Sequence, residues 1–293
     1  MVFYIVRYGE IALKGKNRGN FESILKNNIR EYLKQRYSLN SKLFSVRGRI
    51  ILDVQFDDKV DSDLDIDLRP VFGIVSYSEA LKMPKNFDVI KDKCVEVFKL
   101  IKKDNKTFKI ETHRLDKSFN MNSIEINKVI GAEIIEIFPE VNVKLKNPDI
   151  TMGIEIHSDF AYVYSNLINC FGGLPLGSAG KIAVEFDNNN RSLLCCLLLM
   201  KRGSIIFLIN NEFENNPKTL DMLKLYNNYN PIRIINKENI YKTIKEKDID
   251  SIAYSQEYSD IEKTDNDSEL LLLYPLALNS DKEVEEELKK YEI

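Results

Sequence analysis

The chain has 293 residues, of which 44% are hydrophobic and 30% charged, and a net charge of −3, which is typical of a globular protein with two or three domains. No apolar run approaches the roughly 20 residues that span a bilayer, and the start lacks the features of a signal peptide, so we expect a cytoplasmic protein without membrane contact. Four cysteines without a C-x-x-C pair and only two histidines exclude cysteine-rich and histidine-rich metal sites and indicate reduced thiols.

Residues 1–84 predict an N-terminal ferredoxin-like domain. Val2–Arg7 and Arg49–Phe56 read as strands, and a further strand is expected over Ile74–Leu81. A basic loop, Lys14–Arg18, precedes a helix for which Asn20 is the expected cap. The core face of this helix is marked by apolar residues at helical spacing: Phe21, Ile24, Leu25, Ile29, Tyr32 and Leu33.

A second domain is expected at residues 85–170. Phe87–Lys103 is typical of an amphipathic helix, and apolar residues recurring from Ile126 to Phe138 predict another, ended by Pro139. The intervening and following strands are predicted at Thr107–Thr112, Val141–Leu145, Thr151–Ile156 and Ala161–Leu167.

A third domain, residues 171–293, begins at the glycine-rich hinge Gly172–Gly180. Strands and helices alternate after the hinge, which predicts a mostly parallel sheet with helices on both faces. The expected strands are Lys181–Phe186, Ser204–Ile209, Ile232–Ile235, Asp250–Ala253 and Leu270–Tyr274. The expected helices are Ser192–Met200, Pro217–Leu225, Asn239–Ile244 and Asp281–Tyr291.

The start of this third domain has the layout of a phosphate site. A buried strand, a polar turn and a buried helix follow one another, and backbone N–H groups at such a helix start can hold a phosphate. Lys181 reads either as part of a nucleotide site or as a strand-end charge, and Ser192 either as a helix cap or as a phosphate ligand. The candidate nucleotide-binding residues are Lys181, Asp187, Asn188, Asn189, Arg191 and Ser192.

Charge is distributed unevenly along the chain. Residues 1–50 carry eleven Lys and Arg against three acids, a net charge of +8, whereas residues 236–293 carry eight against sixteen, a net charge of −8. A basic segment at residues 1–50 of an otherwise neutral-to-acidic chain suggests that this segment binds a polyanion. Alternatively, the basic helix simply exposes its charged face to solvent.

Six stretches then match a known pattern in order and spacing: RYGEIALKGKNRGNF at 7–21, RGRI at 47–50, VFGIVS at 71–76, ETHRLDKSF…NSIEINKVIGAEIIE at 111–136, VKLKNPDIT at 143–151 and GGLPLGSAGK at 172–181. They resemble the tRNA 4-thiouridine synthetase (tRNA sulfurtransferase, ThiI-type) family over roughly the first 207 residues. The resemblance implies a multidomain α/β and α+β protein with a ferredoxin-like domain, a THUMP domain that binds the tRNA acceptor stem, and a small Rossmann-like pyrophosphatase-loop domain of the adenine nucleotide alpha hydrolase-like type. Active members adenylate a uridine of tRNA and replace its oxygen with sulfur carried by a cysteine persulfide.

The resemblance also implies which cations contact RNA phosphates, in the salt-dependent and largely sequence-independent manner of such contacts. On the THUMP-like unit, shape and 2′-OH contacts would contribute as well. The predicted RNA-binding residues are Lys14, Lys16, Arg18, Lys26, Arg30, Lys34, Arg47, Arg49, Lys109, Arg114, Lys117 and Lys128.

The chain departs from the family at its reaction sites. Where the family has Ser-Gly-Gly-x-Asp-Ser, residues 187–192 read Asp-Asn-Asn-Asn-Arg-Ser. The family's glycines let the backbone approach the pyrophosphate, whereas Asn188 and Asn189 bring side chains into that space, although asparagine tolerates the left-handed backbone of such a turn. No cysteine follows Cys196 to carry sulfur, and Cys195 and Cys196 lie in the predicted buried helix.

Three functions remain open. The first is a non-catalytic tRNA-binding protein of this family that needs no cofactor, with a third domain that forms a homodimer or docks a partner enzyme. The second is an active ATP-dependent tRNA sulfurtransferase with a divergent site, which uses ATP and magnesium and receives sulfur from another protein. The third is an interaction scaffold whose basic head meets an acidic protein. We prefer the first, and under it we expect no catalytic residues.

Overall fold

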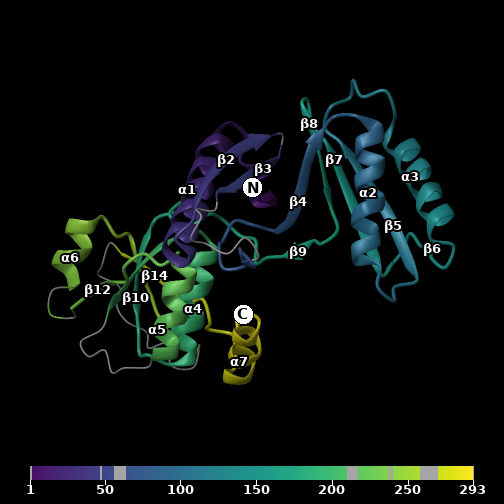
Figure 1. Ribbon diagram of the computed structural model, residues 1–293. Coiled ribbons are helices and arrows are strands. Elements are labelled where there is room, and N and C mark those ends of the chain that lie inside the picture. Colours follow the sequence, from purple (N-terminus) through teal and green to yellow (C-terminus); the bar gives the residue numbers. More distant parts are fainter. Residues whose placement is uncertain are drawn as a thin grey trace. The chain divides into compact units, whose positions relative to one another are not determined.

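The computed structural model describes residues 2–46, 48–55, 64–209, 217–236, 238, 240–257 and 270–292. The chain forms two compact units and enters each of them more than once (Figure 1). The first unit comprises Met1–Val6, Ser41–Phe56 and Tyr77–Ile168, and the second comprises Arg7–Asn40, Asp57–Ser76 and Asn169–Ile293.

The first unit is built on a nine-stranded mixed sheet in the order β2-β3-β1-β4-β8-β7-β5-β6, with β9 paired to β4. β5 runs parallel to β6 and β7, whereas β8 is antiparallel to β7 and β4. The strands are β1 (Val2–Arg7), β2 (Asn40–Val46), β3 (Arg49–Gln55), β4 (Ser76–Pro84), β5 (Thr107–Arg114), β6 (Asn142–Val143), β7 (Ile150–Ile156), β8 (Phe160–Tyr164) and β9 (Ile168–Asn169).

Helices α2 (Phe87–Ile101) and α3 (Ser123–Ile137) pack on one face of this sheet. Asn86 and Asn122 begin them by accepting hydrogen bonds from backbone N–H groups of the first turn, which satisfies donors that a helix start leaves unpaired. The prediction of both helices is confirmed. The core that they share with the strands includes Ile90, Cys94 and Phe98 of α2, Ile126, Ile130 and Ile134 of α3, Phe108 of β5, and Met152 and Ile154 of β7.

β2 and β9 are not predicted from the sequence. β2 has the sequence Asn-Ser-Lys-Leu-Phe-Ser-Val and contains no buried residue, so it lacks the regular apolar face that identifies a strand. β9 has only two residues, too few for any periodicity. The predicted strand over Val141–Leu145 shortens to β6, and the strand expected at Ile74–Leu81 begins instead at Ser76.

Helix α1 (Arg18–Tyr37) follows two short 3-10 turns, Glu10–Leu13 and Gly15–Asn17. Its predicted core face is confirmed for Leu25, Ile29, Tyr32 and Leu33, which are all buried. The prediction that Asn20 caps the helix is wrong, because the helix already begins at Arg18. The preceding residue, Asn17, already has helical backbone angles, and no side-chain hydrogen bond caps the start of the helix.

The second unit contains a five-stranded, entirely parallel sheet in the order β12-β11-β10-β13-β14. This confirms the predicted parallel sheet. Its strands are β10 (Lys181–Glu185), β11 (Ile205–Ile209), β12 (Arg233–Ile235), β13 (Ser251–Ala253) and β14 (Leu271–Leu273). The helices that follow them are α4 (Asn190–Lys201), α5 (Pro217–Tyr226), α6 (Ile240–Lys247) and α7 (Asp281–Lys289).

Helices cover both faces of the parallel sheet, as predicted. One face packs against α4, α5 and α7 in a core that contains Val184, Leu208 and Tyr226. The other face packs against α6, through Ile244. The first residue expected for α6, Asn239, lies outside the described residues.

The glycine hinge lies against the end of α4. Gly173 has a φ of +79°, and a Cβ atom there would lie 2.2 Å from the carbonyl oxygen of Lys201. Only glycine fits such a position without moving the backbone. The neighbouring Leu174 N–H donates to the same oxygen at 2.9 Å, so the hinge also completes the C-terminus of the helix.

The strand order contains a switch point next to β10. The chain passes from β10 to β11 and β12 on one side, and then returns to β13 on the other side of β10. In open parallel sheets, ligands bind beyond the carboxyl ends of the strands at such a point. The residues that follow β10 and β13 therefore determine what this sheet can bind.

Candidate functional site

The turn after β10 is closed by its own side chains. Asn189 caps α4 by accepting a hydrogen bond from the Ser192 N–H at 2.9 Å, and the Asn189 N–H donates to Ser192 Oγ at 3.2 Å. Asn188 adopts a φ of +54°, a left-handed conformation that asparagine tolerates. Ser192 is thus the third residue of a capping box, not the cap. A backbone N–H that this helix start would offer to a phosphate is already bonded within the turn.

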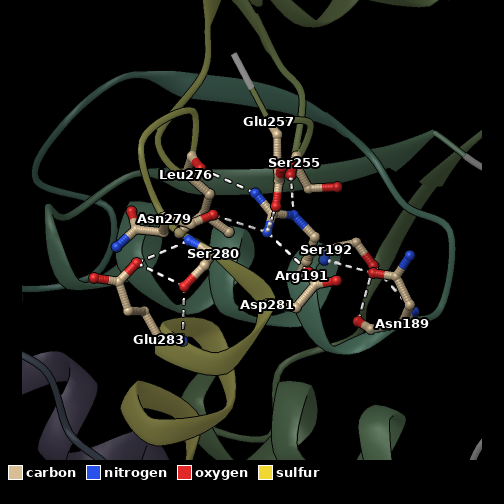
Figure 2. A network of polar contacts seen from close by, with 10 residues as sticks. All are labelled: Asn189, Arg191, Ser192, Ser255, Glu257, Leu276, Asn279, Ser280, Asp281 and Glu283. Carbon is tan, nitrogen blue, oxygen red and sulfur yellow. Dashed lines mark hydrogen bonds and ion pairs between the residues drawn. The ribbon is translucent and has the colours of Figure 1, made fainter. Parts of the chain in front are cut away.

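Arg191 extends from the first turn of α4 to the segments that follow β13 and β14 (Figure 2). Its Nε donates to the Ser255 carbonyl at 2.9 Å, and Nη2 donates to the Leu276 carbonyl at 3.0 Å. Nη1 lies 3.0 Å from the Asn279 carbonyl and 2.9 Å from the Asp281 carboxylate. The guanidinium therefore connects the segments that follow three strands of the sheet, β10, β13 and β14.

All three nitrogens of the Arg191 guanidinium contact acceptors of the protein itself. Glu257 adds a second carboxylate, 3.3 Å from Nη1, and only 15% of the arginine side chain is exposed. An arginine has five N–H donors in a fixed fork, and all three nitrogens here meet acceptors from the chain itself. Each nitrogen of Arg191 therefore already has at least one protein acceptor, and binding of a ligand would compete with these contacts.

The space beside this helix start is lined by carboxylates. A cavity of about 440 Å³ lies there, and Asp281 and Glu285 both contribute to its wall. The helix α7 that carries them begins with its own capping box, formed by Ser280 and Glu283. Of the described residues that line the cavity, Arg191 alone is a cation, and it is already paired with Asp281. An anionic ligand would therefore meet net negative charge.

The structure separates Lys181 from the other predicted nucleotide-binding residues. Lys181 is the first residue of β10, whereas the turn residues follow the last. Its Nζ donates to the carbonyl of Lys247 at 2.7 Å, at the C-terminal end of α6, where a cation is favoured by the helix dipole. Asp187, by contrast, is exposed in the turn itself.

The cysteines are buried or half-buried. Burial raises the pKa of Cys94, Cys170 and Cys195 to about 12, and raises that of Cys196 as well. The thiolate is the nucleophile in sulfur chemistry, and with a pKa near 12 only about one thiol in ten thousand is ionised at pH 8. The prediction that Cys195 and Cys196 are buried is confirmed.

We expect native protein at pH 8 to react with a thiol-specific disulfide reagent far more slowly than free cysteine does. Unfolded protein should expose four rapidly reacting thiols, because unfolding returns each pKa to its ordinary value. Raising the pH toward 12 should speed the native reaction, since thiolate accumulates only there. A native thiol that reacts at pH 8 as fast as free cysteine would show a reactive sulfur site that the burial does not account for.

Arg18 is held in a compact polar cluster at the start of α1. Its Nε donates to Glu22 at 2.7 Å and its Nη2 to the Tyr8 hydroxyl at 2.6 Å, and Tyr8 in turn donates to Glu22. Burial and the neighbouring Glu22 raise the pKa of Tyr8 to about 12. Arg18 therefore orders the basic loop and has less freedom to meet a phosphate than the lysines around it.

The lysines near α1 present their charge more openly. Lys16 and Lys34 are exposed and Lys26 is half-buried, and none of the three forms an ion pair with another described residue. Lys14 lies over the ring of Phe21, 5.0 Å from its centroid. Arg30 is exposed and donates to Asn27 at 2.7 Å. Lys26, Arg30 and Lys34 follow one row of the helix because they are four residues apart.

In the first unit, three of the predicted RNA-binding cations have partners within the protein. Arg49 donates to Glu155 at 3.2 Å, and that carboxylate is fully buried, so Arg49 compensates a charge inside the fold. Lys109 lies 2.9 Å from Glu111. Arg114 donates to backbone carbonyls of the loop that precedes α3.

The remaining predicted cations of the first unit are Lys117, Lys128 and Arg47. Lys117 and Lys128 are exposed, and neither forms an ion pair within the part of the chain that the structure describes. Arg47 lies outside the described residues. The exposed lysines are therefore the positions at which this unit can meet phosphate most directly.

The partners of Arg191 and Arg18 are not predicted from the sequence. Those of Arg191 include backbone carbonyls, which every residue carries, so no residue type identifies them.

Among the described residues, no helix is long and apolar enough to cross a membrane. No cluster of three or more potential metal ligands forms within the same part of the chain.

Two family models match the chain. The ThiI ferredoxin-like domain matches residues 3–78 and the THUMP domain matches residues 84–166. Among solved structures, PH1313 from Pyrococcus horikoshii Ot3 is 28% identical with a TM-score of 0.84, and each chain is covered completely. A 4-thiouridine synthetase in complex with RNA and ATP is 22% identical with a TM-score of 0.80, covering all of this chain and 85% of that one, which shows a shared fold.

Curated relatives share the first part of the chain. A probable tRNA sulfurtransferase of Pediococcus pentosaceus is 40% identical over 60% of this chain and 43% of its own length. A probable tRNA sulfurtransferase of Alkaliphilus oremlandii is 37% identical over 75% of this chain and 55% of its own. The chain thus spans about half the length of the curated relatives it matches. Together with the two domain models, these matches show that the chain belongs to the ThiI-type tRNA sulfurtransferase family.

Proposed function

We propose that this protein binds tRNA and does not thiolate it. The observation that carries the proposal is Arg191, whose guanidinium fills the position beyond β10 and β13 with five contacts to the protein's own acceptors. Nucleotide would be expected at that point of a parallel sheet. The proposed domains are residues 1–84, 85–170 and 171–293, with the first two holding the RNA.

The residues beyond β10 do not fit a magnesium-bound triphosphate. Asn189 already occupies the Ser192 N–H, and the adjoining cavity carries the carboxylates of Asp281 and Glu285. Phosphate binding at a helix start needs open N–H groups and a positive field. Here the Ser192 N–H and the charge of Arg191 are both engaged by contacts within the protein, so binding of ATP would have to compete with the turn and with the start of α7.

Burial makes the cysteines of this chain poor sulfur carriers. The thiols of Cys195 and Cys196 are buried in α4, and their raised pKa opposes formation of a nucleophilic thiolate. An active enzyme of this sequence would therefore need sulfur from another protein as well as a rearranged nucleotide site. The third domain is then free to serve another role, and we place homodimerisation or docking of a partner enzyme there.

RNA binding is supported by family membership and by the open lysines of the basic loop and α1. A relative of the same fold has been solved as a 4-thiouridine synthetase in complex with RNA and ATP. Lys14, Lys16, Lys26 and Lys34 supply positive charge from one short region of the second unit, where Lys16 and Lys34 are exposed and Lys14 and Lys26 are half-buried. Charge of this kind contacts phosphates and gives affinity that falls steeply with salt.

A gel-shift titration with unmodified tRNA tests the proposal. We expect a complex at about 50 mM salt that weakens by at least tenfold at about 200 mM salt, because bound lysines release counterions from the RNA. An acidic polypeptide of equal charge should compete poorly. Absent binding, or binding that salt does not change, would contradict the proposal, and equal displacement by the acidic polypeptide would indicate an interaction scaffold for acidic proteins.

A further inference from the structure

An apolar groove lies between helix α3 and strand β6 in the first unit. This α3–β6 groove has a volume of about 500 Å³. Ile124 at the start of α3 is 66% exposed and Leu145, just after β6, is 76% exposed. Single exposed apolar residues are ordinary, but a hollow lined by several of them marks a place where something binds. Its apolar lining includes Phe108, Ile110, Ile124, Ile135, Val143 and Leu145.

One wall of the groove is the edge of the sheet. Among the described strands, β6 is the last in the sheet order and pairs with β5 alone. Asn142 N–H donates to Lys106 O at 2.8 Å and Lys144 N–H to Phe108 O at 2.9 Å, so both residues turn their backbone groups toward β5. Consecutive residues alternate in direction, and the backbone N–H and C=O of Val143 therefore point outward. β6 has only two residues, so this edge offers one outward N–H and C=O pair, to which the backbone of an extended segment can bond.

The charges along this edge indicate what such a strand would carry. Val143 and Leu145 line the groove, so Lys144 between them lies on the opposite face by strand alternation. Lys144 and Lys146 are both exposed. An added strand would place alternate side chains over the groove and beside these lysines, and opposite charges on neighbouring strands stabilise the pair.

We propose that the α3–β6 groove binds an extended segment of a partner protein, which joins β6 as a further strand and carries alternating apolar and acidic side chains. Extended peptides bind other domains in this way, through main-chain hydrogen bonds at a sheet edge and pockets for alternate side chains. A strand of RNA would match the lysines but would leave Ile124 and Leu145 without apolar partners. The proposal does not require the proposed function, but the groove wall also contains Lys128, one of the predicted RNA-binding positions, so the test includes competition by tRNA.

A synthetic peptide tests the proposal on the full chain. The probe is a fluorescent peptide of about nine residues, an ordinary strand length, in which valine alternates with glutamate. We expect saturable binding that Leu145→Ser weakens by about tenfold, because burial of a leucine side chain is lost. The matched control is Leu100→Ser, which changes a similarly exposed leucine (72%) on α2 outside the groove, and it should bind like wild type.

A charge swap sharpens the test. Lys144→Glu should weaken binding of the valine–glutamate peptide and strengthen binding of a valine–lysine peptide, because the cross-strand charges are exchanged. No saturable binding at millimolar peptide, or equal affinity of wild type and Leu145→Ser, would overturn the proposal. Displacement of the peptide by stoichiometric tRNA would also overturn it, because the groove would then belong to the RNA-binding surface.

Discussion

Replacing Lys14, Lys16, Lys26 and Lys34 together with alanine is expected to weaken tRNA binding by about 100-fold at low salt. Each lysine that contacts a phosphate adds affinity with little regard to sequence, and losing one contact lowers the slope of log affinity against log salt by about one. The slope should therefore fall by about three to four. The measurement is fluorescence anisotropy of labelled tRNA at several salt concentrations.

The control for this variant removes the same charge elsewhere in the second unit. Lys224, Lys242, Lys282 and Lys290 are at least half-exposed and form ion pairs with acids three or four residues away, and changing all four to alanine should leave most of the tRNA affinity. Exposed pairs of this kind contribute about 1 kcal/mol or less to stability, so both variants should fold. Equal loss of affinity in the two variants would mean that net charge alone, and no particular surface, attracts the RNA.

Arg191→Ala is expected to lower the free energy of unfolding of the second unit by about 3 kcal/mol. The change leaves the carbonyls of Ser255, Leu276 and Asn279 without their common donor, and hydrogen bonds to a charged group are among the strongest in proteins. Hydrogen exchange should rise at residues 251–257 and at the start of α7. Arg191→Lys should recover little of this loss, because an ammonium group cannot reproduce the fork of donors.

Arg202→Ala is the matched control. Arg202 directly follows α4, is 63% exposed and contacts Glu10, so its removal should cost about 1 kcal/mol or less. Urea unfolding of Arg191→Ala, Arg191→Lys and Arg202→Ala shows whether the loss of stability is specific to Arg191. If Arg191→Ala unfolded at the same urea concentration as Arg202→Ala, the arginine would not hold the strand ends together, and its contacts would leave room for a nucleotide.

The fold follows largely from patterns that the sequence displays. The apolar runs of Lys181–Phe186 and Leu193–Met200 indicate a buried strand and a buried helix, because a segment covered on all sides has no polar face. The short strands β2 and β9 are not predictable, since exposed or two-residue strands carry no periodic signal. The start of α1 cannot be located from a capping residue, because no side chain caps it.

The site is predictable only in part. The sequence indicates that the turn at residues 187–192 lacks the family's glycines, and the left-handed Asn188 is consistent with that interpretation. It does not indicate that Arg191 binds the chain beyond β13 and β14, because those partners lie 64 to 90 residues away and include backbone oxygens. The twelve predicted RNA-binding positions remain predictions, and the structure distinguishes those with partners inside the protein from the open lysines.

Isothermal titration of magnesium–ATP into the purified protein, with and without tRNA, tests the central claim most directly. The Asn189 side chain occupies the Ser192 N–H, and the Arg191 side chain lies in the space beyond β10. We therefore predict no saturable heat in either titration. One-to-one binding with a dissociation constant below about 1 mM, equivalent to about 4 kcal/mol, would contradict the account and would favour an active sulfurtransferase that opens this site.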